Sequence, residues 1–362
     1  MLPANSPSER TFLPAGCRQH TETQRDACPT LNEAPSQCIF HLQWRAKCIS
    51  LFKKISGLVD VAVDLFNQFF PGRELLFVAQ LLAENDFNLL MVKVSAEIEQ
   101  MGFGTIWLGE ATAREPFAAA ALILSATDRV TVATGIANIW VRDATAMMNG
   151  ARTLAEAWPG RFVLGIGVSH VPSVRARGHQ YERPLSAMRA YLESMENASY
   201  RPPMPDPPPP ILLAALGVKM LELARERTSG AHPYFVPVEH TLEARGILGE
   251  DRVLAPELAV AFARNREAAR VTGERYMRTY LNLENYRRNL LRMGWPQDEL
   301  EPPGSDRIFD ALVAWGQDEE IARKVRLHYE AGADHVAVQV LTPTPERAPL
   351  DDLRRLAPRI VG

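Results

Sequence analysis

The 362-residue chain has no cysteine after residue 48, no excess of basic side chains and no apolar run long enough to cross a membrane. Its 40 Lys+Arg against 43 Asp+Glu leave no basic stripe of the kind that neutralises nucleic-acid phosphates. The opening MLPANSPSER also lacks the basic segment and apolar run of a secretion signal. We therefore expect a soluble, cytoplasmic protein that binds neither nucleic acid nor membrane.

The four cysteines are confined to the first 48 residues, at Cys17, Cys28, Cys38 and Cys48. Two disulfides or a zinc site would use an even count, but tight C-x2-C pairs are missing, so no metal is predicted. Residues 1–50 are rich in Pro, Ser, Thr, Gln and Asn without a sustained apolar period, which favours a poorly structured leader. One hypothesis is that the true start of the protein lies downstream of this leader.

Residues 51–70 place apolar side chains at helical spacing, for example Leu51, Ile55 and Leu58. The polar face mixes lysines with aspartates, whereas a helix lying on a membrane would have a basic polar face. The pattern therefore predicts an amphipathic helix that packs against the main domain or a second subunit.

From residue 71 to residue 362 short β-rich runs alternate with longer helical ones, which is typical of βα units on a parallel sheet. Eight such runs favour a (β/α)8 barrel over an open doubly wound sheet. Residues 264–328 hold too much helix for one crossover, so we expect a helical insertion before the last strand. The predicted strands are 74–79, 104–109, 129–136, 161–166, 211–216, 230–235, a run within 252–262, and 335–341.

The residues that follow each strand matter most, because a barrel builds its site from the loops at the carboxyl ends of its strands. Glycine and polar residues gather there, in Gly109-Glu110, in residues 135–138, 165–170 and 215–217, and at His232. The segment GIGVSH is not a dinucleotide fingerprint, since His170 replaces the third glycine. No P-loop, G-x-S-x-G or H-E-x-x-H motif occurs either, which argues against several common enzyme classes.

These strand ends resemble a known family, the bacterial luciferase-like superfamily, and within it the enzymes that use the deazaflavin coenzyme F420. The resemblance runs from about Gly72 to Pro358, and it implies a (β/α)8 TIM barrel with an insertion. It is carried by EIEQMGFGTIWLGEA, VTVATGIANIW, GRFVLGIGVSH, LLAALGVKMLELA, SGAHPYFVPVEHT, YLNLENYRRNLLRMG and AGADHVAVQVL.

The resemblance also implies where the cofactor lies. In relatives the flat ring rests against a bulge in strand three with a cis peptide, here the Gly135–Ile136 bond. Loop backbone after strands four and five holds the phosphate, although Val218 stands where many relatives have proline. Lys219, Arg142 and Arg175 are candidates for the cofactor's anionic tail. The implied cofactor-binding residues are Gly135, Ile136, Ala137, Asn138, Gly167, Val168, Ser169, Ala215, Leu216 and Gly217.

Glu110 and His170 are the catalytic residues that the resemblance implies. Glu110 occupies the position where many relatives have an acid or histidine, so it is a candidate acid/base or substrate-orienting residue. His170 is a candidate contact to the ring or the substrate. The alternatives are that Glu110 caps the next helix and that His170 hydrogen-bonds a loop.

The leading interpretation of function is an F420-dependent oxidoreductase that transfers a hydride between the deazaflavin C5 and a small organic substrate. The alternative is an FMN-dependent luciferase-like monooxygenase that uses oxygen and takes reduced FMN from a separate reductase. A further alternative is a non-catalytic barrel that acts as a binding or assembly protein. Because relatives are often dimers, a homodimer is expected.

Overall fold

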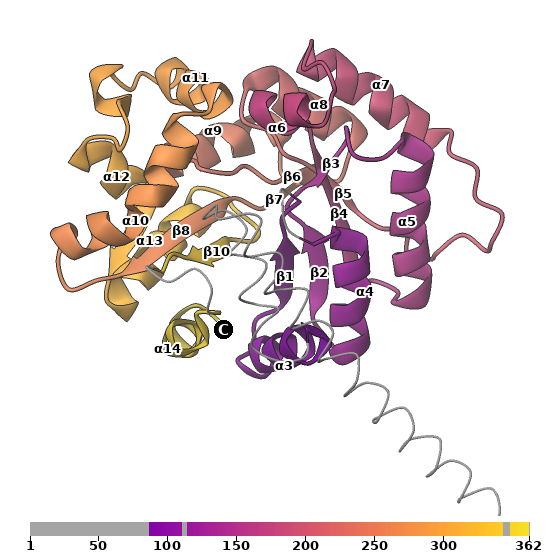
Figure 1. Ribbon diagram of the computed structural model, residues 1–362, viewed down its shortest axis with the longest axis horizontal. Helices are drawn as coiled ribbons and strands as arrows, with labels where there is room; N and C mark the ends of the chain where they lie inside the picture. Colours follow the sequence, from indigo (N-terminus) through magenta and orange to yellow (C-terminus); the bar gives the residue numbers. More distant parts are fainter. Residues whose placement is uncertain (1–86, 111–113, 343–347, 362) are drawn as a thin grey trace, which may run out of the picture. The chain divides into compact units, whose positions relative to one another are not determined.

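The computed structural model describes residues 87–110, 114–342 and 348–361, where helices alternate with parallel strands (Figure 1). The strands are β1 (Thr105–Leu108), β2 (Thr131–Thr134), β3 (Ala137–Asn138), β4 (Phe162–Gly167), β5 (Ile211–Leu213), β6 (Gly230–Ala231), β7 (Val253–Leu254), β8 (Glu257–Phe262), β9 (Val313–Gly316) and β10 (Ala337–Val340). The helices are α3 (Phe87–Gln100), α4 (Pro116–Ala126), α5 (Ala144–Ala157), α6 (Val171–Ala176), α7 (Pro184–Glu196), α8 (Val218–Arg227), α9 (Val238–Leu248), α10 (Arg266–Leu281), α11 (Glu284–Arg292), a 3-10 turn η1 (Asp298–Leu300), α12 (Asp306–Leu312), α13 (Asp318–Glu330) and α14 (Leu350–Ile360).

The described strands form two sheets in which every pair is parallel. The larger sheet has the order β1-β2-β4-β5-β6-β7, with β3 paired to β4, and the smaller sheet has the order β10-β8-β9. The chain passes from one sheet to the other at Pro256, which lies between β7 and β8 and has no N–H to donate to a ladder. The result is an α/β fold with a half-barrel of parallel strands.

Helices cover the strands because each strand is apolar on the side that they face. α4 packs on β1 and β2, α5 on β4, α8 on β5 and β6, and α13 on β8 and β9. The largest core cluster joins buried strand residues such as Val132 and Leu164 to helix residues such as Met147 and Leu221. This packing fixes the strands at their carboxyl ends, where the functional loops begin.

Most of the predicted strands are present, with shorter bounds than expected. The run 230–235 is a strand only over Gly230–Ala231, since Phe235 adopts a left-handed conformation with φ of 56°. The segment 264–328, where a helical insertion is expected, contains α10, α11 and α12 but also the strand β9, so the insertion stays a prediction. The four residues of β9 follow directly on α12 and pair with β8, so this strand is defined by its tertiary pairing.

Several expectations concern residues that the structure does not describe. The leader 1–50, the helix 51–70 and the strand 74–79 all lie outside the described residues. Closure of the strands into a complete eight-stranded barrel therefore stays a prediction. None of the helices that the structure does describe combines the length and apolar character that crossing a membrane would require.

Candidate functional site

The carboxyl ends of β3, β4 and β5 bring together three segments that are far apart in the sequence. Asn138 of β3 pairs with Gly167 at the end of β4. After β5, the Ala214 amide donates to the Ile166 carbonyl at 2.9 Å. Because these parallel strands end at one edge, the predicted cofactor-binding residues in 135–138, 167–169 and 215–217 lie on neighbouring strand ends.

The peptide bond between Gly135 and Ile136 is cis, which confirms the position expected for the bulge after β2. The Gly135 amide donates to the Leu108 carbonyl of β1 at 2.8 Å. Gly167 lies directly against the bulge, because a β-carbon built there would be 2.7 Å from Cδ1 of Ile136. A side chain at position 167 would therefore displace Ile136, so the strand end requires glycine.

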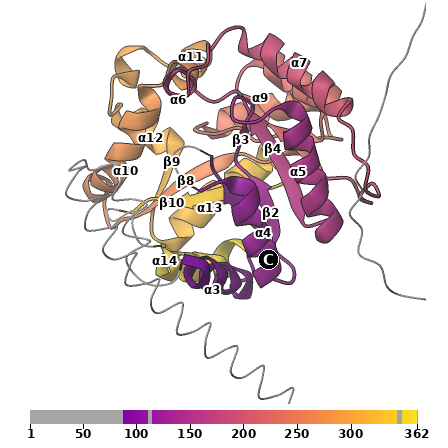
Figure 2. The same cartoon turned by 45° about the vertical axis from the view of Figure 1, so that its right-hand side comes forward.

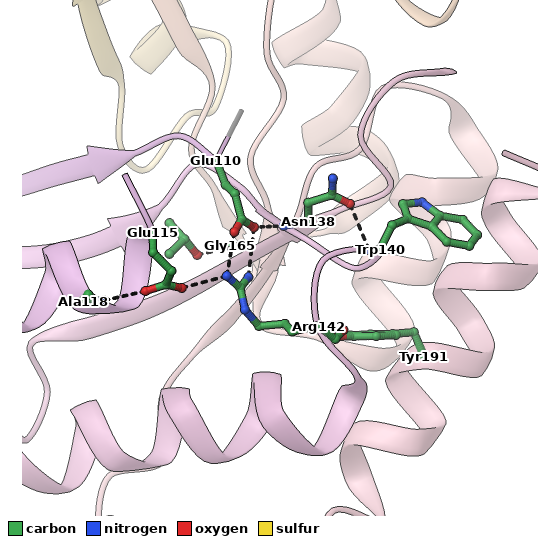
Figure 3. Close-up of polar contacts among 9 residues, drawn as sticks. Glu110, Glu115, Ala118, Asn138, Trp140, Arg142, Gly165 and Tyr191 are labelled. Atoms are coloured by element: carbon green, nitrogen blue, oxygen red, sulfur yellow. Dashed lines mark hydrogen bonds and ion pairs between the residues drawn. The ribbon is translucent and has the colours of Figure 1, made fainter. Parts of the chain in front are cut away.

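Glu110 is held by Arg142 and by the backbone of the β3 segment (Figure 3). Nη1 and Nη2 of Arg142 donate to Oε2 and Oε1 of Glu110 at 2.9 and 2.6 Å, and the Asn138 amide donates to Oε2 at 2.7 Å. The Glu110 side chain is only 7% exposed and the Arg142 side chain only 14%. Both carboxylate oxygens thus have partners, and Glu110 ties the end of β1 to the bulge.

Arg142 is also bound to Glu115, whose carboxylate accepts from its Nη2 at 2.7 Å. The other oxygen of Glu115 accepts from the Ala118 amide and caps α4, so the capping role considered for Glu110 belongs to Glu115. Tyr191 donates its hydroxyl to the Arg142 carbonyl at 2.8 Å. With its guanidinium shared between two carboxylates, Arg142 is not available for the cofactor's anionic tail.

The loops after β4 and β5 present backbone N–H groups at the same edge. Ser169 adopts a left-handed conformation with φ of 57°, and Gly217 is the N-cap of α8. Among the residues that the structure describes, the amides of Ser169, Leu216 and Gly217 have no protein acceptor. His240 of α9 fixes this loop from behind, since its Nε2 lies 2.7 Å from the Leu216 carbonyl.

His170 precedes α6 and is packed against α11, which lies beside α6 in Figure 2. Its Nδ1 is 3.2 Å from Oδ1 of Asn285, and its ring centroid is 5.4 Å from that of Tyr286. Burial lowers the pKa of His170 below its usual value, although the hydrogen bond to Asn285 opposes this. At neutral pH the imidazole is therefore uncharged.

Trp107 of β1 is a site residue that the sequence analysis missed, and His232 is one that it placed at a strand end without assigning it a role. Their rings stack with centroids 4.1 Å apart, and Nε1 of Trp107 donates to Nε2 of His335 at 3.0 Å. His232 Nδ1 lies 2.6 Å from the Ala255 carbonyl, and burial lowers the pKa of His232 to about 4. The neutral ring directs Nε2 toward the bulge, 3.2 Å from a β-carbon built on Gly135.

A tyrosine cluster from α10, α11 and the loop after β6 lies next to His170. Its members are Tyr234, Tyr276, Tyr280 and Tyr286, with ring centroids of neighbouring members 4.9 to 6.3 Å apart. Beneath it, the Tyr276 hydroxyl donates to Oε2 of buried Glu257 at 3.0 Å. Burial raises the pKa of Glu257 to about 8, so its carboxyl is largely protonated at pH 7.

Within the described residues, no group of three His, Cys, Asp or Glu side chains is placed to hold a metal ion.

Comparison with known proteins defines the class to which this fold and these strand ends belong. Residues 90–335 match the family model of the luciferase-like monooxygenases. The match covers more than half of the chain, and the chain belongs to this family.

The names of individual relatives and similar structures mention two cofactors, F420 and FMN. A Mycobacterium tuberculosis protein, provisionally named a coenzyme F420-dependent oxidoreductase, is 29% identical over 150 residues, 41% of each chain, so this chain spans less than half of that relative's length. An F420-dependent secondary alcohol dehydrogenase, solved with an F420–acetone adduct, is similar at a TM-score of 0.61 and 14% identity over 75% of this chain and 95% of that one. A type II Baeyer–Villiger monooxygenase from Pseudomonas putida, solved with FMN, is similar at a TM-score of 0.57 and 16% identity. This similarity covers 75% of this chain and 93% of that one. At these identities, the similarity of this chain to the two solved structures shows a shared fold alone.

Proposed function

We propose that the protein is an oxidoreductase that binds coenzyme F420 and transfers a hydride between the deazaflavin C5 and a small organic substrate. The observation that carries the proposal is the cradle formed by the Gly135–Ile136 bulge and by amides of the β4 and β5 loops that have no acceptor among the described residues. The names of the mycobacterial relative and of the alcohol dehydrogenase support F420 as the cofactor.

The residues of the cradle suit a flat ring with a phosphate. The N–H groups of Ser169, Leu216 and Gly217 have no acceptor in the described part of the chain, and Gly217 lies at the start of α8. Such backbone donors suit a phosphate. A β-carbon built on Gly217 meets no atom within 4 Å, so space remains for a ligand to approach this backbone. Lys219 and Arg175 remain candidates for the anionic tail.

When bound, the deazaflavin supplies a carbon centre that gives or accepts a hydride. The chain's own residues hold the geometry for this transfer. Glu110 orients the bulge through the Asn138 amide, which makes it a positioning residue in addition to the acid/base or substrate-orienting role expected from the sequence. His170, neutral and held by Asn285, contacts the ring or the substrate.

An FMN-dependent monooxygenase is the second candidate. The FMN complex of the Pseudomonas putida enzyme and the name of the family favour it. In that case a separate reductase would be the partner that supplies reduced FMN.

Titration of the purified full chain with F420 and with FMN, each oxidised and reduced, tests the proposal. We expect F420 to bind tightly and FMN weakly. Preference for FMN would support the monooxygenase instead, and binding of neither would favour the non-catalytic barrel.

Glu110→Gln then separates the two roles of that residue. Loss of positioning weakens F420 binding, by roughly tenfold for one charged hydrogen bond. Loss of acid/base chemistry alone would lower turnover and leave F420 binding unchanged.

A further inference from the structure

A cavity of about 470 Å³ lies between β9, α12 and α13, where β8 and β9 end. Figure 2 labels these elements, and none of them contributes a residue to the proposed cofactor cradle. The volume is within the range of small-molecule sites. Its lining includes Arg264, Asp310, Trp315, Glu320, Arg323 and Lys324.

The two acids in the lining are already engaged. Oδ2 of Asp310 accepts from Arg266 at 2.7 Å, and its Oδ1 accepts from Nε1 of Trp315 at the same distance. Oε2 of Glu320 accepts from the Gln317 amide in the capping box of α13. The ion pair of Asp310 is with Arg266, which does not line the cavity, and the contact of Glu320 is with backbone.

Among the residues that the structure describes, the three cations of the lining form no ion pair with a carboxylate. In the part of the chain that the structure describes, Arg264 and Arg323 have no hydrogen-bond acceptor or ion-pair partner. The amine of Lys324 has one backbone acceptor, the Asp310 carbonyl at 3.3 Å. Burial and the neighbouring Arg323 charge lower the pKa of Lys324, while Glu239 of α9 and Asp310 partly oppose this.

An anion in the cavity would relieve the repulsion among these cations, and it would give the guanidinium groups the planar partner that they bind in a bidentate manner. We infer that this cavity binds a small molecule through an oxyanion with two or more negative charges, carried by a phosphate or a polycarboxylate. The inference does not depend on the proposed function.

Calorimetric titration of the full chain with pyrophosphate and with citrate, at low and at high salt, tests the inference. We expect millimolar or tighter binding of at least one anion that weakens as salt rises. The preferred anion tells phosphate from polycarboxylate. If neither anion binds at low salt, the inference is wrong.

Variants of the cations locate the binding. The double variant Arg264→Gln, Arg323→Gln should lower the affinity for the anion by tenfold or more, because each substitution removes a charged hydrogen bond. Lys324→Met should weaken it too, while keeping the buried alkyl chain. Both arginines are exposed, so these changes should leave the unfolding transition in place.

Arg326→Gln is the matched control, because Arg326 lies on the same helix, is paired with Glu319 and does not line the cavity. It removes one positive charge and should leave anion binding within twofold of wild type after correction for net charge. If anion affinity fell equally in the control and in the double variant, the inference would be wrong. F420 affinity should be unchanged in all variants.

Discussion

Glu110 and Arg142 form a bidentate ion pair that also holds the Asn138 amide, which joins β1 to the bulge next to the proposed ring site. The pair is nearly buried, so its charges are screened less by water than those of surface pairs. The pair therefore links the end of β1 directly to the bulge.

Arg142→Gln should lower the free energy of unfolding by about 3 kcal/mol, because it leaves the Glu110 carboxylate buried without its cation. Urea unfolding followed by circular dichroism measures this. Arg326→Gln, which breaks an exposed pair with Glu319, should change the free energy of unfolding by about 0.5 kcal/mol at most. Equal effects of the two variants would show that burial of the Glu110 pair adds nothing.

Gly165→Ala should destabilise the protein by roughly 3 kcal/mol or prevent folding, since overpacking of backbone cannot be relieved by a rotamer change. A β-carbon at this position would be 1.9 Å from the Thr134 carbonyl oxygen. Gly104→Ala is the control, because its β-carbon meets no atom within 4 Å. Thermal unfolding compares the two, and equal midpoints would contradict the close approach of β2 and β4.

Glu257→Gln should stabilise the protein increasingly as pH rises from 4.5 to 8. Burial raises the pKa of Glu257 from 4.5 in the unfolded chain to about 8, so the folded state keeps a proton that the unfolded state loses in this window. Wild-type stability therefore falls with rising pH, and glutamine removes this loss.

The gain from Glu257→Gln should be on the order of 3 kcal/mol at pH 8 and small near pH 5. Urea unfolding at several pH values measures it. Glu330→Gln, at an exposed position of α13, should show no such trend. A pH-independent difference for Glu257→Gln would mean that its carboxyl is ionised in the folded state.

His328→Gln should make stability less sensitive to acid. Burial, with a smaller contribution from the Lys324 charge, lowers the pKa of His328 to about 4, so between pH 6.5 and 4 only the unfolded chain binds this proton. Wild-type stability is thus fully present above pH 6.5 and is lost as pH falls toward 4. Unfolding between pH 7 and 4.5 should show a shallower decline in the variant, and parallel curves would contradict the shift.

Local pattern predicted several strands, and the family resemblance predicted the position of the cis bond. Alternating apolar residues located β1, β2 and β4, and the resemblance in TGIAN located the cis bond at Gly135–Ile136. The strands depend on residues that are close in sequence, whose spacing can be recognised without the rest of the chain. The cis bond was expected only because the segment resembles its counterpart in the family.

Sequence by itself thus determined the α/β class, the family and the segments that meet at the strand ends. Only the tertiary structure decided that Arg142 binds Glu110, that Trp107 stacks on His232, and that Glu257 is buried beneath Tyr276. It also decided that Val313–Gly316 is a strand, because pairing with β8 and not local periodicity makes it one. The physical reason is the same in each case: burial and hydrogen bonding depend on which distant segments pack together, and spacing along the chain carries no record of that.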